Sequence, residues 1–198
     1  MKVLWIVIAI AVITGGYFFF QNGFGLHGSQ SSCSSLQNPQ DQASCSQCAA
    51  AGESGIRDAC YLGIATKSNS LGICDNISNS LKRDECYSDI GMKSSDLGVC
   101  DKVNDSGFKD MCYRGYASTN KDLSVCDKIQ NPDFKSWCHE EVAVQMQDPN
   151  LCAQLTEWTR RDICYNAIAI AKHDASICSN MSDLNKQSCI QKVGAGSQ

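Results

Sequence analysis

The sequence predicts an all-α protein: a disulfide-stapled α/α solenoid of six 26-residue two-helix repeats, preceded by an N-terminal transmembrane helix. Three observations lead to this prediction. Cysteines recur at alternating intervals of 12 and 14 residues, helix start signals recur with the same period, and an uncharged apolar segment opens the chain. Self-similarity at a fixed period of about 20 to 50 residues is typical of solenoids and repeat arrays.

The first element is the apolar segment. Residues 3–20 carry no charge over 18 positions, enough for a helix to cross the roughly 30 Å hydrocarbon layer of a bilayer. We therefore expect residues 1–20 to be a single-pass membrane anchor, with Lys2 and the N-terminus in the cytoplasm. The alternative is a cleaved signal peptide and a secreted protein, but the A-x-A sequence at Ala9 to Ala11 falls inside the apolar run.

Cysteine content indicates the compartment. All 14 cysteines of the 198-residue chain follow residue 20, so the anchor prediction places them outside the cytoplasm, where disulfides form. Cys45 and Cys48 alone have the close spacing of a structural zinc site, and we expect no metal or other cofactor. The net charge of −4 and the lack of a basic cluster argue against a nucleic acid partner.

The repeats follow a Gly-, Ser- and Gln-rich segment, residues 21–32, that we expect to be a flexible linker. From Cys48 onward the cysteine intervals alternate between 12 and 14, and the last interval is 11. The repeat domain is thus expected at residues 33–192, followed by a flexible tail at 193–198. Three positions, counted from the second cysteine of each unit, keep the period: Lys or Arg three before it, usually Tyr one after it, and Ala or Gly five after it.

Each unit is predicted to contain a helix of about eight residues, a turn and a second helix of about fourteen, because the apolar or small residues gather on one helical face. The first helix has N-cap signals, whose side-chain oxygens accept exposed N–H groups, at Ser70, Asp96, Asp122, Asp148 and Asp174. The second helix has start signals at Ser54, Ser80, Ser106 and Asn131.

Two disulfide schemes fit the spacing, because cysteines 12 apart across a hairpin and cysteines 14 apart across a junction can both lie level. Pairing by fourteens leaves Cys33, Cys45, Cys48 and Cys189 without clean partners. Pairing by twelves uses every cysteine and is favoured: Cys33 with Cys45, Cys48 with Cys60, Cys74 with Cys86, Cys100 with Cys112, Cys126 with Cys138, Cys152 with Cys164 and, in the short last unit, Cys178 with Cys189. Each such bond is worth about 3 kcal/mol in the chain-entropy account.

A run of exported two-helix units, each with a cysteine in either helix, resembles the disulfide-bridged Sel1-like cysteine-rich repeat proteins of bacteria. The resemblance is architectural and covers residues 48–190. It implies an α/α superhelix that acts in binding rather than catalysis, and it carries no functional residue over to this sequence.

Two periodic series allow competing interpretations. The tyrosine row is either a ligand-binding row or, as favoured here, packing between units; it consists of Tyr61, Tyr87, Tyr113 and Tyr165, with His139 in the fourth unit. A basic residue followed by an acid either binds an anionic polymer or, as favoured, lies on a solvated face with weak ion pairs between units. This second series comprises Arg57-Asp58, Arg83-Asp84, Lys109-Asp110 and Arg161-Asp162.

A candidate binding site lies where the chain departs most from the repeat, between Trp137 and Trp158. Aromatic residues dominate contact energy at interfaces, and solenoids often bind where a unit departs from its consensus. The candidate binding residues are Trp137, His139, Glu140, Glu141, Trp158, Tyr113 and Tyr165.

No catalytic constellation is evident, since neither a Ser-His-Asp arrangement nor paired carboxylates on one face can be recognised, and we expect no enzymatic activity. The Cys45-Ser46-Gln47-Cys48 motif resembles a redox dithiol but lacks the β-α-β context of such motifs. The leading hypothesis is a membrane-anchored, extracytoplasmic scaffold that binds a protein or an envelope component. The alternative is an exported thiol protein that handles copper or redox equivalents, which would require free thiols.

Overall fold

The computed structural model describes residues 32–195. The predicted anchor at residues 1–20 and the predicted linker up to residue 31 lie outside this range, as do residues 196–198. Within it the protein is all-α, with no strand, and carries seven disulfides at repeating intervals. None of the helices in the described range combines the length and apolarity needed to traverse a bilayer.

Long helices alternate with single-turn elements over most of this range. The long helices are α3 (Pro39–Cys48), α4 (Ser54–Ser68), α6 (Ser80–Gly91), α8 (Ser106–Asn120), α9 (Pro132–Met146), α11 (Trp158–Lys172) and α12 (Asp183–Ala195). The short elements are α5 (Leu71–Cys74), α7 (Gly98–Asp101), η1 (Leu123–Lys128), α10 (Pro149–Cys152) and η2 (Ala175–Asn180), of which η1 and η2 are 3₁₀ turns.

The short helices are shorter than the predicted eight residues. They contain four residues as α-helix or six as 3₁₀-helix. A single turn fixes several dihedral angles for very few hydrogen bonds and is unstable alone, so these turns depend on the disulfide that holds each of them against the next long helix.

The first 26-residue unit, which starts at Cys48, has no separate short helix, although residues 32–34 around Cys33 are helical. The ten-residue helix α3 carries both Cys45 and Cys48, and it therefore supplies the second cysteine of one disulfide and the first cysteine of the next. The prediction of two helices with the same proportions in every unit is wrong for this unit.

The predicted N-caps of the short elements are confirmed in part. Three carboxylates accept a backbone N–H two residues on: Asp122 from Ser124, Asp148 from Asn150 and Asp174 from Ser176. Asp96 accepts from the N–H of Gly98 but precedes the cap residue by one position, and Ser70 makes no side-chain cap.

Three long helices begin at the predicted start signals, and their caps lie one residue earlier. Ser54, Ser80 and Ser106 are the first helical residues, whereas the caps are Glu53, Asn79 and Asp105. The reason is chemical, since the side chains of Asn79 and Asp105 accept the N–H groups of Lys82 and Phe108. The predicted cap at Asn131 is confirmed, because its side chain accepts from Asp133 and Phe134.

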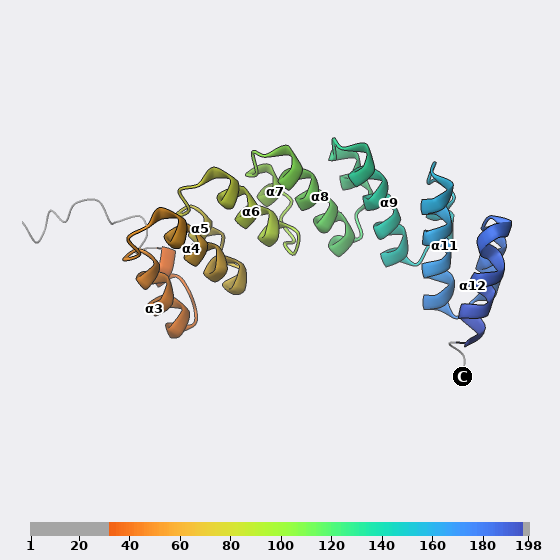
Figure 1. Ribbon diagram of the computed structural model, residues 1–198, viewed down its shortest axis with the longest axis horizontal. Coiled ribbons are helices and arrows are strands. Elements are labelled where there is room, and N and C mark those ends of the chain that lie inside the picture. Colours follow the sequence, from red (N-terminus) through yellow and green to blue (C-terminus); the bar gives the residue numbers. More distant parts are fainter. Residues whose placement is uncertain (1–31, 196–198) are drawn as a thin grey trace, which may run out of the picture.

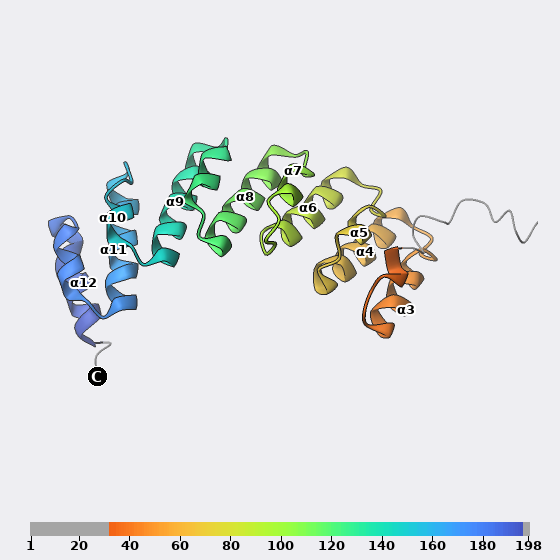
Figure 2. The same cartoon turned by 180° about the vertical axis from the view of Figure 1, so that it is seen from behind.

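The long helices lie side by side in chain order and form a curved row from α3 to α12 (Figures 1 and 2). Each of them contacts the long helix before it and the long helix after it, and the short elements pack beside them. The buried side chains accordingly form three successive clusters along the row instead of one central core.

The seven disulfides follow the pairing by twelves, with eleven in the last unit. They join Cys33 to Cys45, Cys48 to Cys60, Cys74 to Cys86, Cys100 to Cys112, Cys126 to Cys138, Cys152 to Cys164 and Cys178 to Cys189. Their Cα atoms are 5.5 to 5.8 Å apart, a normal disulfide separation. No free cysteine remains.

The periodic Ala or Gly makes room for the disulfide of the following unit. A Cβ added at Gly91 would lie 2.4 Å from the Sγ of Cys112, closer than two such atoms can approach. Ala117 and Ala143 occupy the same position in later helices, are fully buried, and share a core cluster with Cys138 and Cys164, respectively. Each unit therefore covers the disulfide of the next one.

The first unit shows what happens without this cover. Helix α3 ends at Cys48, and Ala50, which stands five residues after Cys45, is exposed. Cys60 is consequently the only one of the 14 cysteines that is not buried.

The last helix extends beyond the predicted domain end. Helix α12 continues to Ala195, and Val193 is buried against the final cluster. The expected tail at residues 193–198 is therefore helical over its first three residues, because Val193 contributes apolar surface to the core.

Candidate functional site

Buried aspartates join neighbouring units, and they correct the prediction of a solvated face. The junction aspartates are Asp58, Asp84, Asp110 and Asp162, each two residues before the second cysteine of its unit. Each accepts hydrogen bonds from residues 20 or 21 positions later, at the start of the next long helix. Asp110, for example, accepts from the backbone N–H groups of Gln130 and Asn131 at 2.9 and 2.8 Å.

The hydrogen bonds also set the charge of two junction aspartates. Burial raises the pKa of Asp58, but the backbone N–H groups of Ser78 and Asn79 and the Ser78 hydroxyl outweigh it and leave the pKa below its usual value. Burial likewise raises the pKa of Asp162. Hydrogen bonds from Ser182 and Asn185 lower it by more, so the pKa lies below its usual value. Both groups are therefore carboxylates, and each binds the N-terminus of a helix.

The junction between α9 and α11 has no such aspartate, because Ser136 stands at the corresponding position. A cluster of aromatic and charged side chains fills this part of the row instead. We call it the Trp137 cluster; it comprises Arg114, Phe134, Trp137, Glu140, Glu141 and Arg160.

Trp137 is held between two arginines. The guanidinium carbons of Arg114 from α8 and Arg160 from α11 lie 5.6 and 5.1 Å from the centre of its indole ring. Glu141 accepts from Arg114 at 3.1 Å, and Glu140 accepts from Arg160 at 3.2 Å. Three of the candidate binding residues, Trp137, Glu140 and Glu141, thus connect three successive long helices, and their side chains are engaged with other parts of the chain.

The tyrosine row is packed between units. Tyr61, Tyr87, Tyr113 and Tyr165 are all buried, as the favoured interpretation predicts. Burial, together with a hydrogen bond to Asp75 or Asp101 within the same unit, raises the pKa values of Tyr87 and Tyr113 to about 12. Tyr113 and Tyr165 therefore present no free aromatic face for a partner.

His139 replaces tyrosine in the fourth unit and is partly buried. Its Nε2 lies 4.0 Å from the carboxylate of Asp127, which also binds Lys135 at 2.9 Å. Burial lowers the pKa of His139 more than the Asp127 charge raises it. This residue takes part in a local contact between η1 and α9.

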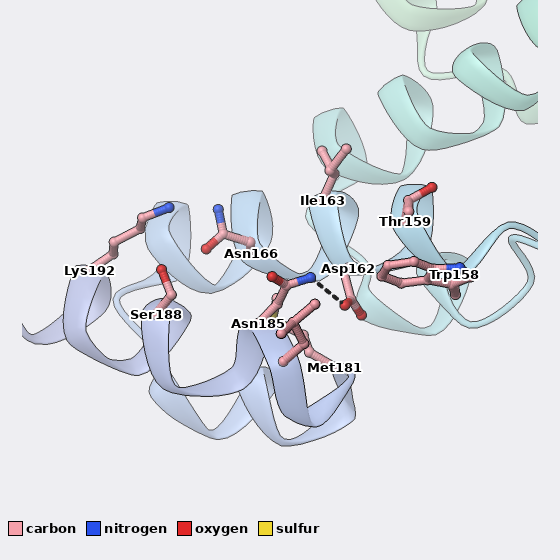
Figure 3. Close-up of a pocket in the computed structure, with 10 residues that line it drawn as sticks. Trp158, Thr159, Asp162, Ile163, Asn166, Met181, Asn185, Ser188 and Lys192 are labelled. Carbon is pink, nitrogen blue, oxygen red and sulfur yellow. Dashed lines mark hydrogen bonds between the residues drawn. The ribbon is translucent and has the colours of Figure 1, made fainter.

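Trp158 is the candidate that remains accessible. It is half exposed at the start of α11 and borders a hollow of about 380 Å³ between α11 and α12. We call this hollow the C-terminal groove; its walls are Trp158, Thr159, Asp162, Ile163 and Asn166 on α11, and Met181, Leu184, Asn185, Ser188 and Lys192 on or before α12 (Figure 3). Ile163 and Leu184 are 50% and 79% exposed at its rim.

The groove exists because two repeat positions carry small polar residues in the last unit. In α9, Phe134 and Trp137 stand four residues and one residue before the second cysteine, with their rings 5.2 Å apart. In α12 the same positions hold Asn185 and Ser188. The junction between α11 and α12 therefore keeps its aspartate, Asp162, but lacks the large side chains that fill the middle of the row.

The groove divides into two ends of different chemistry. Figure 3 shows Trp158 at one end beside Asp162, and Lys192, Ser188 and Asn166 together at the other end. The carboxylate of Asp162 is bound by Asn185 at 2.9 Å, whereas the side chains of Asn166, Ser188 and Lys192 have no polar partner within residues 32–195. The groove thus offers apolar contact at one end and unpaired donors at the other.

Two observations concern metal binding and the Cys45-to-Cys48 motif. Residues 32–195 contain no group of three or more His, Cys, Asp or Glu side chains placed to hold a metal ion. Cys45 and Cys48 are not bonded to each other, because they belong to two different disulfides.

Comparisons with models of protein families, with curated protein sequences and with solved structures gave no match. The resemblance to Sel1-like proteins therefore remains an interpretation of the sequence alone.

Sequence reasoning missed the junction aspartates as structural residues and missed the groove. The signal for the first was present, since an acid stands at this position in four of the six units, with Ser136 and Gln187 in the other two. The signal for the second was the loss of large residues at positions 185 and 188 of the last unit.

Proposed function

We propose that this protein is a membrane-anchored, extracytoplasmic α/α solenoid that acts as a scaffold and binds a protein or envelope partner through its C-terminal groove. The observation that carries the proposal is the exposure of Trp158, Ile163 and Leu184 around a hollow of about 380 Å³. Large apolar side chains gathered at a concave site are typical of interaction surfaces.

The proposed location rests on the disulfides and on the N-terminal sequence. Seven disulfides with no free cysteine are typical of proteins that fold in an oxidising compartment. The apolar residues 3–20 would tether the row of helices to the outer face of a membrane, and a cleaved signal peptide would release it instead.

The alternative, an exported thiol protein for copper or redox traffic, has weaker support. Thiolates are the groups that bind copper and exchange with disulfides, and every cysteine of this chain is already paired. Titration of the purified protein with a thiol reagent under denaturing, non-reducing conditions separates the two functions: the scaffold predicts no free thiol, and the carrier predicts several.

Binding through the groove is tested by replacing Trp158. We expect Trp158→Ala to remove most of the partner recovered by the full-length protein from an envelope extract, and Ile56→Ala to leave it unchanged. Ile56 is a matched control, because it is also exposed but lies on α4 near the other end of the row. Equal recovery by the parent and the Trp158→Ala protein would refute the proposal.

The anchor is tested separately. The protein should stay with membranes through a high-salt wash and retain Met1 to Phe20. A mature N-terminus between Gly16 and Ser32 would instead assign it to the secreted class.

A further inference from the structure

The polar end of the C-terminal groove indicates the charge of its ligand. Lys192, Asn166 and Ser188 can all donate hydrogen bonds, and none of these side chains has a partner within residues 32–195. Figure 3 shows the three side chains on the same side of the groove, with the Lys192 ammonium directed toward Asn166. Three unpaired donors, one of them cationic, favour a carboxylate as the group bound there.

The other end of the groove indicates an apolar neighbour for that carboxylate. Trp158 and Ile163 from α11 and Leu184 from α12 are half exposed or more, so a ligand side chain placed among them removes apolar surface from water. Asp162 lies at this end, remains ionised, and repels a second carboxylate. The orientation of a ligand is thereby fixed, with its acid toward Lys192 and its apolar group toward Trp158.

We propose that the C-terminal groove binds a segment of a partner polypeptide in which a large apolar side chain stands next to an acidic residue. This inference rests on the proposed function, because it names the ligand of the same groove. A volume of about 380 Å³ is at the lower end of the range for small-ligand pockets and suits a pair of side chains. A membrane surface would instead require several cations, and among residues 32–195 Lys192 is the only cation that lines the groove.

The test uses the full-length protein and short synthetic peptides with blocked ends. The probe is acetyl-Gly-Phe-Glu-Gly-amide, and the matched controls are the same peptide with Gln in place of Glu or with Ala in place of Phe. Binding is followed by titration calorimetry. We expect the Phe-Glu peptide to bind about five to ten times more tightly than the Phe-Gln peptide at low salt, because one charge-assisted contact is lost.

Variants of the protein show which residue contacts the acid and which contacts the apolar side chain. Lys192→Gln should abolish the preference for Glu over Gln, whereas Lys121→Gln, at an exposed lysine on the C-terminal cap of α8, should keep it. Trp158→Ala should weaken binding of every peptide that contains Phe. An oligomer of N-acetylglucosamine serves as the carbohydrate probe, because exposed tryptophans also stack on sugars.

The outcomes separate this inference from the proposed function. Equal binding of the Glu and Gln peptides, or a preference that survives Lys192→Gln, overturns the ligand class. If Trp158→Ala still removes binding of both peptides in that case, the groove stands as a binding site and only its proposed ligand fails. Binding of the oligosaccharide in place of the peptides would also overturn the inference.

Discussion

The middle of the row and its two ends are built from the same repeat but differ in how well each unit is covered by its neighbour. At the junction between α8 and α9, Asp110 binds the start of the next helix, and Phe134 and Trp137 fill the space beside it. At the N-terminal end, Cys60 is left partly exposed. At the C-terminal end, the aspartate is present but small residues leave a groove.

This difference shows that two separate features stabilise a junction. A buried aspartate satisfies the free N–H groups at the start of the next helix, and large side chains fill the volume between helices. The junction between α9 and α11 has the large side chains but no aspartate. The junction between α11 and α12 has the aspartate but no large filling side chains. A groove is left where the filling side chains are missing.

The largest expected effect is the loss of a junction aspartate in the middle of the row. Asp110→Ala removes the acceptor of two part-buried hydrogen bonds, from the N–H groups of Gln130 and Asn131, and should lower the free energy of unfolding by about 2 to 3 kcal/mol. Chemical denaturation with segment-resolved hydrogen exchange measures both the loss and its location, which should be the start of α9.

The matched control lies one unit further along. Ser136 occupies the equivalent position, makes no such bond, and its replacement by Ala should change stability by less than about 0.5 kcal/mol. Equal effects of the two variants would mean that the aspartates do not join the units.

Removal of the Trp137 side chain should lower the free energy of unfolding somewhat less than loss of Asp110. Trp137→Ala deletes a half-buried ring and its contacts with Arg114 and Arg160, and we expect a loss of about 2 kcal/mol in the free energy of unfolding. Trp137→Phe keeps an aromatic face and should recover about half of this loss. The account is contradicted if Trp137→Ala is as stable as the parent in urea denaturation.

Acid should loosen the junctions formed by Asp58 and Asp162. The pKa of each carboxyl is lowered in the folded protein, so its stabilising effect is present above the ordinary pKa of about 4 and is lost as the pH falls through the lower folded value. Unfolding measured between about pH 5 and pH 2 should show decreasing stability, and Asp58→Asn should reduce the slope. A parent protein whose stability is constant over this range would disprove this explanation.

The smallest expected effect is on the rate at which the disulfide at the N-terminal end of the row is reduced. Thiol–disulfide exchange requires access to sulfur, so a mild dithiol reductant should open the bond between Cys48 and Cys60 before the others. Alkylation followed by peptide mass spectrometry identifies the first thiols. Reduction of Cys100 and Cys112 at the same rate would show that cover by the preceding unit does not protect the inner disulfides.

Much of this fold was predictable because its main determinant is covalent and periodic. The cysteine count alone favoured the pairing by twelves, and the recurring caps at Asp122, Asp148 and Asp174 located the short elements. The lengths of those elements were not predictable, since a cap and a cysteine four residues later fit either one turn or two.

The candidate site was predictable only in part, because the role of a side chain depends on which helix it faces. Trp137 and Trp158 were both predicted as binding residues, but the first lies between Arg114 and Arg160 and the second beside an open groove. The burial of Asp58 and its relatives was missed for the same reason, since a Lys or Arg beside each acid suggested a solvated ion pair.

The most direct test of this account is to fill the C-terminal groove in the manner of the middle junctions. Ser188→Trp places at the last unit the residue type found at position 137, and Gln187→Trp, at an exposed residue of α12 that does not line the groove, is its control. We predict that the Ser188→Trp protein keeps its helical content and melting temperature but binds the Phe-Glu peptide at least about tenfold more weakly, whereas Gln187→Trp binds as the parent does. A folded Ser188→Trp protein with unchanged affinity would contradict the claim that unfilled space at this junction forms the binding site.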